Sequence, residues 1–214
     1  MINIIQREFT MQSQETTGIH IEGHIKIWDP ESKTVYINKR NAIHYENISI
    51  ALANSIANSG KGFVYEMAFG NGGTAIDPTG IITYLTPNSS GSNASLYNQT
   101  FQKVVNQNSV NNKDPSRNFI EVRHVTGTNY TDVFVTCLLD YGDGNTSGQQ
   151  AFDNTIDANG SFVFDELGLK SYSASGNSLL LTHVIFHPVQ KSLNRLIQID
   201  YTVRVQSLTG IVGV

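Results

Sequence analysis

The acidic segment Asp140-Tyr141-Gly142-Asp143-Gly144-Asn145 is the best candidate in the sequence for an ion site. Side-chain oxygens at short spacing, with glycines between them, suit Ca²⁺. The segment lacks the twelve-residue spacing of a calcium-binding loop, and no glutamate follows it to bind an ion through both oxygens. A tight hairpin turn closed by Asp and Asn side chains explains the same residues. Both interpretations stay open, and we assign no metal ligand here.

The glycine-rich run Gly70-Asn71-Gly72-Gly73 follows an apolar strand pattern, which invites comparison with a phosphate-binding loop. The Walker spacing is absent, no Lys-Ser/Thr pair follows, and no helix pattern opens after the glycines. The backbone donors that cradle a phosphate therefore cannot be assembled. We predict no phosphate site and no cofactor.

Two pairs of histidines stand four residues apart, His20 with His24 and His183 with His187. On a helix this spacing could chelate zinc. The residues between His183 and His187 predict a strand instead. Residues four apart on a strand share a face but lie about 13 Å apart. We therefore expect neither pair to share a metal.

Residues for nucleophilic or acid–base catalysis are not grouped in the sequence. The Gly-x-Ser-x-Gly turn is absent. The single thiol, Cys137, lies in an apolar run and is predicted to be a buried free side chain, and one cysteine excludes a disulfide framework. Asp165 and Glu166 are adjacent, but neighbours on a strand point to opposite faces, so we expect that they cannot act together on one bond. We predict that the protein is not an enzyme.

Strand patterns cover most of the chain. Alternating or wholly apolar runs predict about eight or nine strands, and the run from Arg195 to Val205 alternates throughout. The other runs cover residues 19–27, 34–37, 63–69, 119–125, 132–139, 161–169 and 179–186, with shorter pieces at 81–85 and 101–105. This pattern indicates a mainly β fold, an antiparallel β-sandwich with one inserted α-helix.

The helix is predicted at about residues 41–58, where Tyr45, Ile48, Leu52 and Ile56 recur at spacings of three and four. Asn38 or Asn41 can cap its beginning, and Ser59-Gly60 can end it. Apolar residues on a second face suit a helix between a sheet and another surface. Burial within its own fold explains them equally well.

The predicted organisation is an extended arm over residues 1–18, one domain over 19–207 and a tail over 208–214. Residues 77–118 read mostly as a long polar loop, and long ordered loops are usually functional or docked. The apolar runs fall short of the ~20 residues of a membrane span. Met1 to Thr17 also lacks a signal-peptide pattern. We therefore expect a soluble protein without a membrane partner.

Charged residues make up 15% of the sequence, and the formal net charge is −4. Because its Lys and Arg residues are scattered, the chain lacks the basic cluster that displaces counterions from phosphates. Direct binding to nucleic acid is therefore not expected. A neutral polar surface repels its own copies little, which suits close packing in a homo-oligomer. A loop-rich protein explains the same composition.

The run Gly70 to Gly73, called the glycine elbow below, and the C-terminal third of the chain contain several motifs in a characteristic order. Residues 66–73 form an apolar strand pattern ending in glycines, and Glu166-Leu167-Gly168-Leu169 is followed by Leu179 to Lys191 and the alternating strand from Leu196 to Val203. This order resembles tailed-bacteriophage virion proteins, especially those with the collar-type domain that attaches fibres to tails. Residues 25–47 are similar to virion structural proteins of large phages. The resemblance covers roughly residues 20–75 and 160–205 and leaves the polar middle unmatched.

The resemblance implies a structural component of the virion, assembled in the host cytoplasm. The sequence has no long C-terminal shaft, so we expect a ring-forming or adaptor subunit of the neck, collar or tail. Its partners would be its own copies and adjoining virion proteins. The predicted interface residues are those in the arm, the elbow and the mid-chain loop: Ile4, Ile5, Phe9, Gly70, Gly72, Gly73, Tyr97 and Phe101.

Two alternative functions remain. The first is a fibre-attachment, glycan-binding or receptor-binding module, for which Tyr84, Tyr97 and Tyr130 could supply aromatic faces. The second is a capsid decoration protein.

Overall fold

The computed structural model describes residues 18–91, 94–143, 162–174, 176–192 and 194–208. The secondary structure of these residues is mainly strand. The elements in chain order are β1 (Gly18–Trp28), β2 (Val35–Ile43), α1 (Tyr45–Ile56), β3 (Val64–Gly70), β4 (Thr74–Ile76), β5 (Ile82–Tyr84), β6 (Gln99–Val104), β7 (Phe119–His124), β8 (Tyr130–Leu139), β9 (Phe162–Ser171), β10 (Thr182–Lys191) and β11 (Ile197–Leu208). The predicted mainly β fold with one main helix is confirmed.

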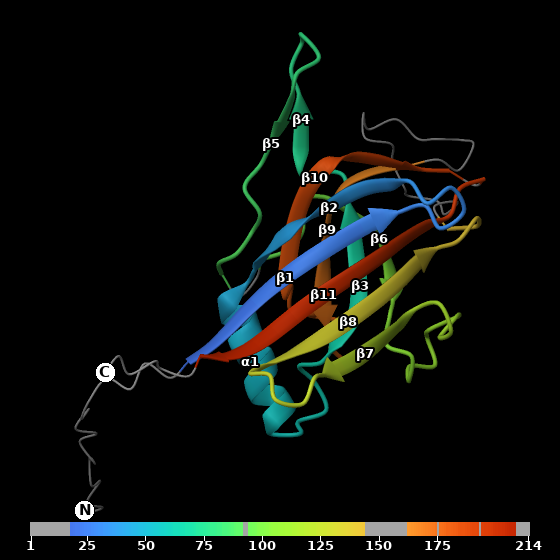
Figure 1. Ribbon diagram of the computed structural model, residues 1–214. Coiled ribbons are helices and arrows are strands. Elements are labelled where there is room, and N and C mark those ends of the chain that lie inside the picture. The colour runs from blue at the N-terminus through green and yellow to red at the C-terminus, as the bar shows by residue number, and fades with distance from the viewer. Residues whose placement is uncertain (1–17, 92–93, 144–161, 175, 193, 209–214) are drawn as a thin grey trace, which may run out of the picture.

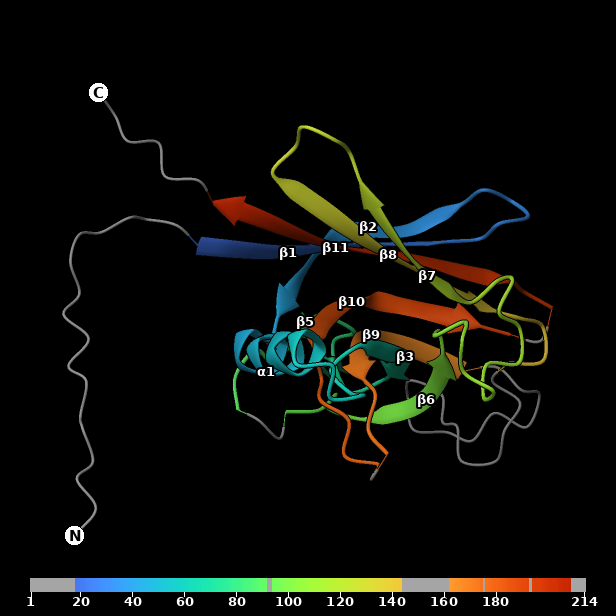
Figure 2. The same ribbon diagram turned by 90° about the horizontal axis from the view of Figure 1, so that it is seen from below.

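One antiparallel sheet contains nine of the described strands, in the order β6-β3-β9-β10-β2-β1-β11-β8-β7. The sheet curls so that β2, β1, β11, β8 and β7 form a front layer over a back layer of β10, β9, β3 and β6 (Figures 1 and 2). Helix α1 covers one end of this sandwich, and the hairpin β4–β5 projects from the body. The ends of the curled sheet are β6 and β7.

The two layers meet where β2 pairs with β10. This pairing is short, with Ile43 opposite Thr182 and Ala42 opposite His183. The chain then leaves β2 through His44, whose N–H donates to the carbonyl of Leu181. A short pairing lets the layers diverge, and the divergence makes room for the core between them.

The core between the layers is apolar and closely packed. The ring of Phe164 packs edge-on against Phe69, with centroids 5.4 Å apart, and edge-on against Phe186, with centroids 5.7 Å apart. The strongly alternating β11 contributes Tyr201, which is fully buried. Cys137 is a buried free thiol, as predicted, and burial raises its pKa to about 12.

The helix begins later than the sequence predicted. Asn41 belongs to β2 and pairs with Gly23 of β1, so neither Asn38 nor Asn41 caps the helix. His44 is the cap, because its Nδ1 accepts the N–H of Asn47. Strand pairing across the sheet takes precedence here over the local preference of asparagine for caps.

The predicted apolar face of the helix is only partly correct. Ile48 and Leu52 pack against the core, but Tyr45 is 63% exposed and Ile56 is 86% exposed. Asn47 and Ala51 are the buried residues of α1. The sheet contacts a narrower stripe of the helix than the sequence spacing implied, because α1 lies over the end of the sandwich.

Residues 77–118 contain the two short strands that the sequence predicted at 81–85 and 101–105. The chain forms β5, which pairs with β4 in a hairpin that the sequence did not predict, and β6. Gly18 and Leu208, which the sequence assigned to the arm and the tail, pair with each other in the sheet. The arm-domain-tail division otherwise stays a prediction. Within the described residues, no helix is both long enough and apolar enough to cross a membrane.

Strand β9 passes close to β10 at Gly168, and a substitution there tests this contact. A Cβ atom at Gly168 would lie 2.3 Å from the carbonyl oxygen of Thr182, which is backbone and cannot move freely. Gly168→Ala is therefore expected to lower the free energy of unfolding by about 1–3 kcal/mol, as overpacking does. The matched control is Gly142→Ala, where a Cβ meets nothing within 4 Å. Chemical denaturation of both variants measures the difference, and equal midpoints would contradict the proposed steric conflict.

Candidate functional site

The carboxylate of Glu166 on β9 is fully buried and accepts four hydrogen bonds. Oε1 accepts the N–H groups of Gly72 at 3.1 Å and Asn98 at 2.8 Å. Oε2 accepts the N–H of Tyr97 at 2.9 Å and lies 2.9 Å from Nε2 of His183. One side chain thus fastens the glycine elbow after β3, the segment before β6 and the strand β10.

The hydrogen bonds of His183 define its protonation. Its Nδ1 accepts the N–H of Asn88 at 2.8 Å, so this nitrogen carries no proton. Its Nε2–H then donates to Glu166. The ring is a neutral imidazole with both nitrogens engaged, and it anchors the Asn88 segment to the buried carboxylate.

The neighbouring carboxylate, Asp165, binds the same elbow. Oδ1 accepts the N–H of Gly73, and Oδ2 accepts the N–H and the hydroxyl of Thr74. The sequence predicted that Asp165 and Glu166 point away from each other. They do bind different groups, but the elbow curves so that its consecutive N–H groups reach both carboxylates.

The elbow needs glycines because its backbone runs against other groups. A Cβ at Gly70 would lie 2.5 Å from both the carbonyl oxygen of Asn98 and Oε1 of Glu166. At Gly72 a Cβ would come within 2.8 Å of the Asn98 nitrogen. The sequence indicated an unusual turn here but not its purpose, which is to present N–H groups to buried carboxylates.

On both carboxylates burial raises the pKa and the accepted hydrogen bonds lower it, but the net shift differs between the two. Burial raises the pKa of Asp165 and outweighs its bonds to Thr74 and Gly73. Burial also opposes ionisation of Glu166, but the bonds from His183, Asn98 and Tyr97 together lower its pKa. Both oxygens of Glu166 accept hydrogen bonds, as those of an ionised carboxylate do. Because the chain itself fills the acceptor positions of Glu166, the arrangement suits a structural role rather than acid–base catalysis. Glu166 and the residues bonded to it, Gly72, Tyr97, Asn98 and His183, are called the buried lock below.

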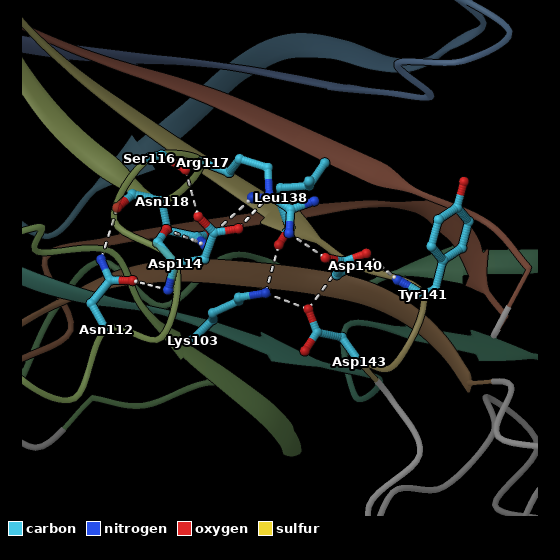
Figure 3. Close-up of polar contacts among 10 residues, drawn as sticks. All are labelled: Lys103, Asn112, Asp114, Ser116, Arg117, Asn118, Leu138, Asp140, Tyr141 and Asp143. Carbon is cyan, nitrogen blue, oxygen red and sulfur yellow. Dashed lines mark hydrogen bonds and ion pairs between the residues drawn. The ribbon is translucent and has the colours of Figure 1, made fainter.

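A second polar cluster joins the two layers near the acidic turn (Figure 3). Lys103 of β6 forms an ion pair with Asp143, and its Nζ donates to the carbonyl of Leu138 at 2.7 Å. Asp143 also accepts the N–H of Asp140, which closes the turn. Lys103 therefore bridges the back-layer edge strand to β8 of the front layer.

Arg117 extends this cluster along the loop before β7. Its guanidinium pairs with both Asp114 and Asp140 (Figure 3). The Asn118 side chain accepts the N–H of Leu138 at 2.9 Å and donates to the carbonyl of Asp114 at 3.0 Å. These contacts fasten the loop to the end of β8.

The acidic turn is occupied by the cations of its own chain. Lys103 forms an ion pair with Asp143, and Arg117 forms one with Asp140. Gly144 and Asn145 lie outside the described residues. Across the described ranges, no group of three or more His, Cys, Asp or Glu side chains is placed to hold a metal. The N–H of Asp143 donates to the carbonyl of Asp140 at 3.0 Å, so Asp140–Asp143 form a side-chain-closed turn. The predicted hairpin is wrong, because β8 does not pair with the next described strand, β9.

The predicted interface residues that the structure describes differ in how exposed they are. Tyr97 is 45% exposed and Phe101 is half-buried. Gly70 and Gly73 are buried and Gly72 is half-buried, and all three support the elbow. The arm residues Ile4, Ile5 and Phe9 lie outside the described residues. The role of these eight residues in an interface stays a prediction.

The three tyrosines considered for glycan binding do not share one groove. Tyr130 lies on β8 beneath the guanidinium of Arg204, 3.9 Å from its ring centroid. Tyr84 lies on the projecting hairpin, and Tyr97 donates its hydroxyl hydrogen to the carbonyl of Thr86. Tyr84 lines a surface hollow together with Lys39, Pro87 and His187.

Glu166→Gln tests the buried lock. The substitution keeps the shape, but its NH₂ group would face a backbone N–H donor in the interior. We expect the free energy of unfolding to fall by about 2–4 kcal/mol. The control Glu46→Gln lies on the exposed first turn of α1 and is expected to cost under about 1 kcal/mol. Denaturant titration measures both, and similar losses would contradict the lock.

Lys191 at the end of β10 gives a pH test. It is fully buried, and burial lowers its pKa from 10.5 to about 8. Between pH 8 and 10.5 the unfolded chain binds a proton that the folded chain lacks. The free energy of unfolding should therefore rise with pH in this window, by up to roughly 3 kcal/mol from this group.

Lys191→Met should remove that rise, whereas Lys113→Met, at an exposed loop position, should keep it. Denaturation at several pH values between 7.5 and 10.5 provides the measurement. The difference between the two variants isolates Lys191 from the other groups that titrate in this range. Parallel pH profiles for the two variants would show that Lys191 is not the responsible group.

Comparison with known proteins gives no match: no family model, no curated protein and no solved structure is similar to this chain. The resemblance to tailed-phage virion proteins therefore stays a prediction from the residues.

Proposed function

We propose that the protein is a non-catalytic structural subunit of a tailed-phage virion, a ring-forming or adaptor piece of the neck, collar or tail. The observation that carries the proposal is the projecting hairpin β4–β5 (Figure 1). Ile76 is 52% exposed, Ile81 is 61% exposed and Tyr84 is 54% exposed on this hairpin, and Leu85 just after it is 44% exposed. Exposed apolar side chains grouped on one projection are typical of a surface that contacts another protein.

The base of the hairpin is held rigidly. Thr74, the first residue of β4, donates two hydrogen bonds to the buried Asp165. On the other side, the N–H of Leu85 donates to the carbonyl of Gly73. The apolar projection is thus fixed to the buried lock, as suits an adaptor that must hold a partner in one orientation.

A glycan- or receptor-binding module is the second candidate. It is favoured by a hollow beside the hairpin, where Tyr84 lies with Lys39, Pro87 and His187. An exposed aromatic ring beside polar side chains can stack against a sugar ring. Binding to a glycan array that Tyr84→Ala abolishes would favour this candidate over assembly.

The assembly role can be tested on the particle itself. Antibodies raised against the purified chain should label virions encoded by the same genome, at the neck or tail in electron micrographs. Ile76→Ser combined with Ile81→Ser should reduce incorporation of the chain into those particles at least about tenfold, by removing apolar contact area.

The matched control for the hairpin variant is Val110→Ser, which removes a 92% exposed apolar residue from a different loop. The control should be incorporated normally. Both variants should keep the wild-type denaturation midpoint, because the altered residues are exposed. Virions that carry no label, although the infected cells contain the chain, would contradict the proposal.

A further inference from the structure

Strand β7 is a free edge of the front layer. It pairs with β8 on one side, and no described strand pairs with its other side. Figures 1 and 2 show β7 at the rim of the layer, in yellow-green. An open edge offers unpaired N–H and C=O groups to an incoming strand.

The side chain of Gln107 shows which β7 groups point outward. Its Oε1 accepts the N–H of Ile120 at 3.0 Å, and its Nε2 donates to the carbonyl of Ile120 at 3.0 Å. This amide binds Ile120 as the peptide group of a neighbouring strand would. Because strand geometry repeats every two residues, the backbone groups of Val122 and His124 also point outward.

The side chains of β7 divide between two faces. Ile120 and Val122 face the sandwich interior, where with Val133 they line an apolar cleft of about 400 Å³. Val122 is nevertheless 65% exposed. Glu121 and Arg123 lie on the outer face, where they form an exposed ion pair of 2.6 Å.

This charge order distinguishes the registers in which β7 could pair antiparallel with another β7. If Glu121 faced its own copy, or Arg123 faced its own copy, like charges would lie directly opposite each other, which is destabilising. If Val122 lies opposite Val122, each Glu121 faces the partner subunit's Arg123 on both sides of the axis. In the same register the outward-pointing N–H and C=O groups of the two Val122 residues face each other. Each Val122 then donates one hydrogen bond to the other and accepts one from it.

We propose that β7 is a self-association edge: two copies pair their β7 strands antiparallel about a two-fold axis at Val122. The Val122 side chains then meet over the apolar clefts, and four alternating charges form a network on the outer face. The central hydrogen bonds leave Gln107 in place. The outer bonds between Ile120 and the partner subunit's His124 form when Gln107 moves aside.

This inference deepens the proposed function, because it names a surface through which copies associate, and it rests on that function for the expectation that copies meet. A two-fold contact is closed after two copies. A ring would therefore need a second and different contact, for which the projecting hairpin is available.

Sedimentation equilibrium of the full chain, over concentrations up to the high micromolar range, tests the pairing. Glu121→Lys and Arg123→Glu, each alone, should weaken the dimer at least about tenfold, since each creates two like-charge pairs. The double variant Glu121→Lys/Arg123→Glu restores opposite charges and should return the dimer to near wild-type strength.

A matched control uses the ion pair of Glu22 and Arg40, 3.5 Å apart on the inner strands β1 and β2 of the same layer. Glu22→Lys and Arg40→Glu should leave the dimer unchanged. Val122→Pro removes an outward N–H that β8 does not use, so it should abolish the dimer while the chain stays folded.

A wild-type chain that is monomeric throughout the series would overturn the proposal. A dimer that tolerates both single charge reversals would also overturn the proposal, even if Val122→Pro prevents dimer formation. In that case β7 would pair with a strand other than the partner subunit's β7. Labelled virions with a monomeric chain would refute only the β7 pairing. A charge-dependent dimer whose virions stay unlabelled would refute only the virion role.

Discussion

Placing the charge of Glu166 in the interior is the constraint on which the neighbouring structure depends. An ionised carboxylate without partners would cost several kcal/mol in an apolar core. The chain meets this cost with three backbone N–H groups and one imidazole, drawn from three separate segments. Each segment must therefore adopt one particular path: the elbow turns at Gly72, the strand β6 is entered through Asn98, and β10 places His183 inward.

The projecting hairpin follows from the same centre. Asp165 fixes the first residue of β4, and the elbow bound by Glu166 sets the direction in which the chain leaves β3. Thus the exposed apolar residues of the hairpin start from a base that two buried carboxylates hold. A partner docked on the hairpin would be oriented by the core of the sandwich, as the proposed assembly role requires.

The curl of the sheet creates a second constraint at its two ends. Strands β6 and β7 end the sheet without pairing to each other, so side chains bridge the gap. Lys103 reaches from β6 to β8, and Asn118 and Gln107 tie the intervening loop to β8 and β7. Gln107 covers only one of the outward-pointing residues of β7. The remaining open edge is where a second copy is proposed to pair.

The sequence by itself determined the fold class and most of the strands, because alternation in a strand such as β11 records which side chains face the core. It also determined the burial of Cys137 and the need for an unusual turn at Gly70 to Gly73. Only the tertiary structure decided that Glu166 meets His183, that Asn41 belongs to a strand rather than a cap, and that Lys103 occupies the acidic turn. Local patterns reflect the period of one element. These contacts instead join residues 17, 18 and 40 positions apart: Glu166 with His183, Gly23 with Asn41, and Lys103 with Asp143. Their partners are set by strand order and sheet curl.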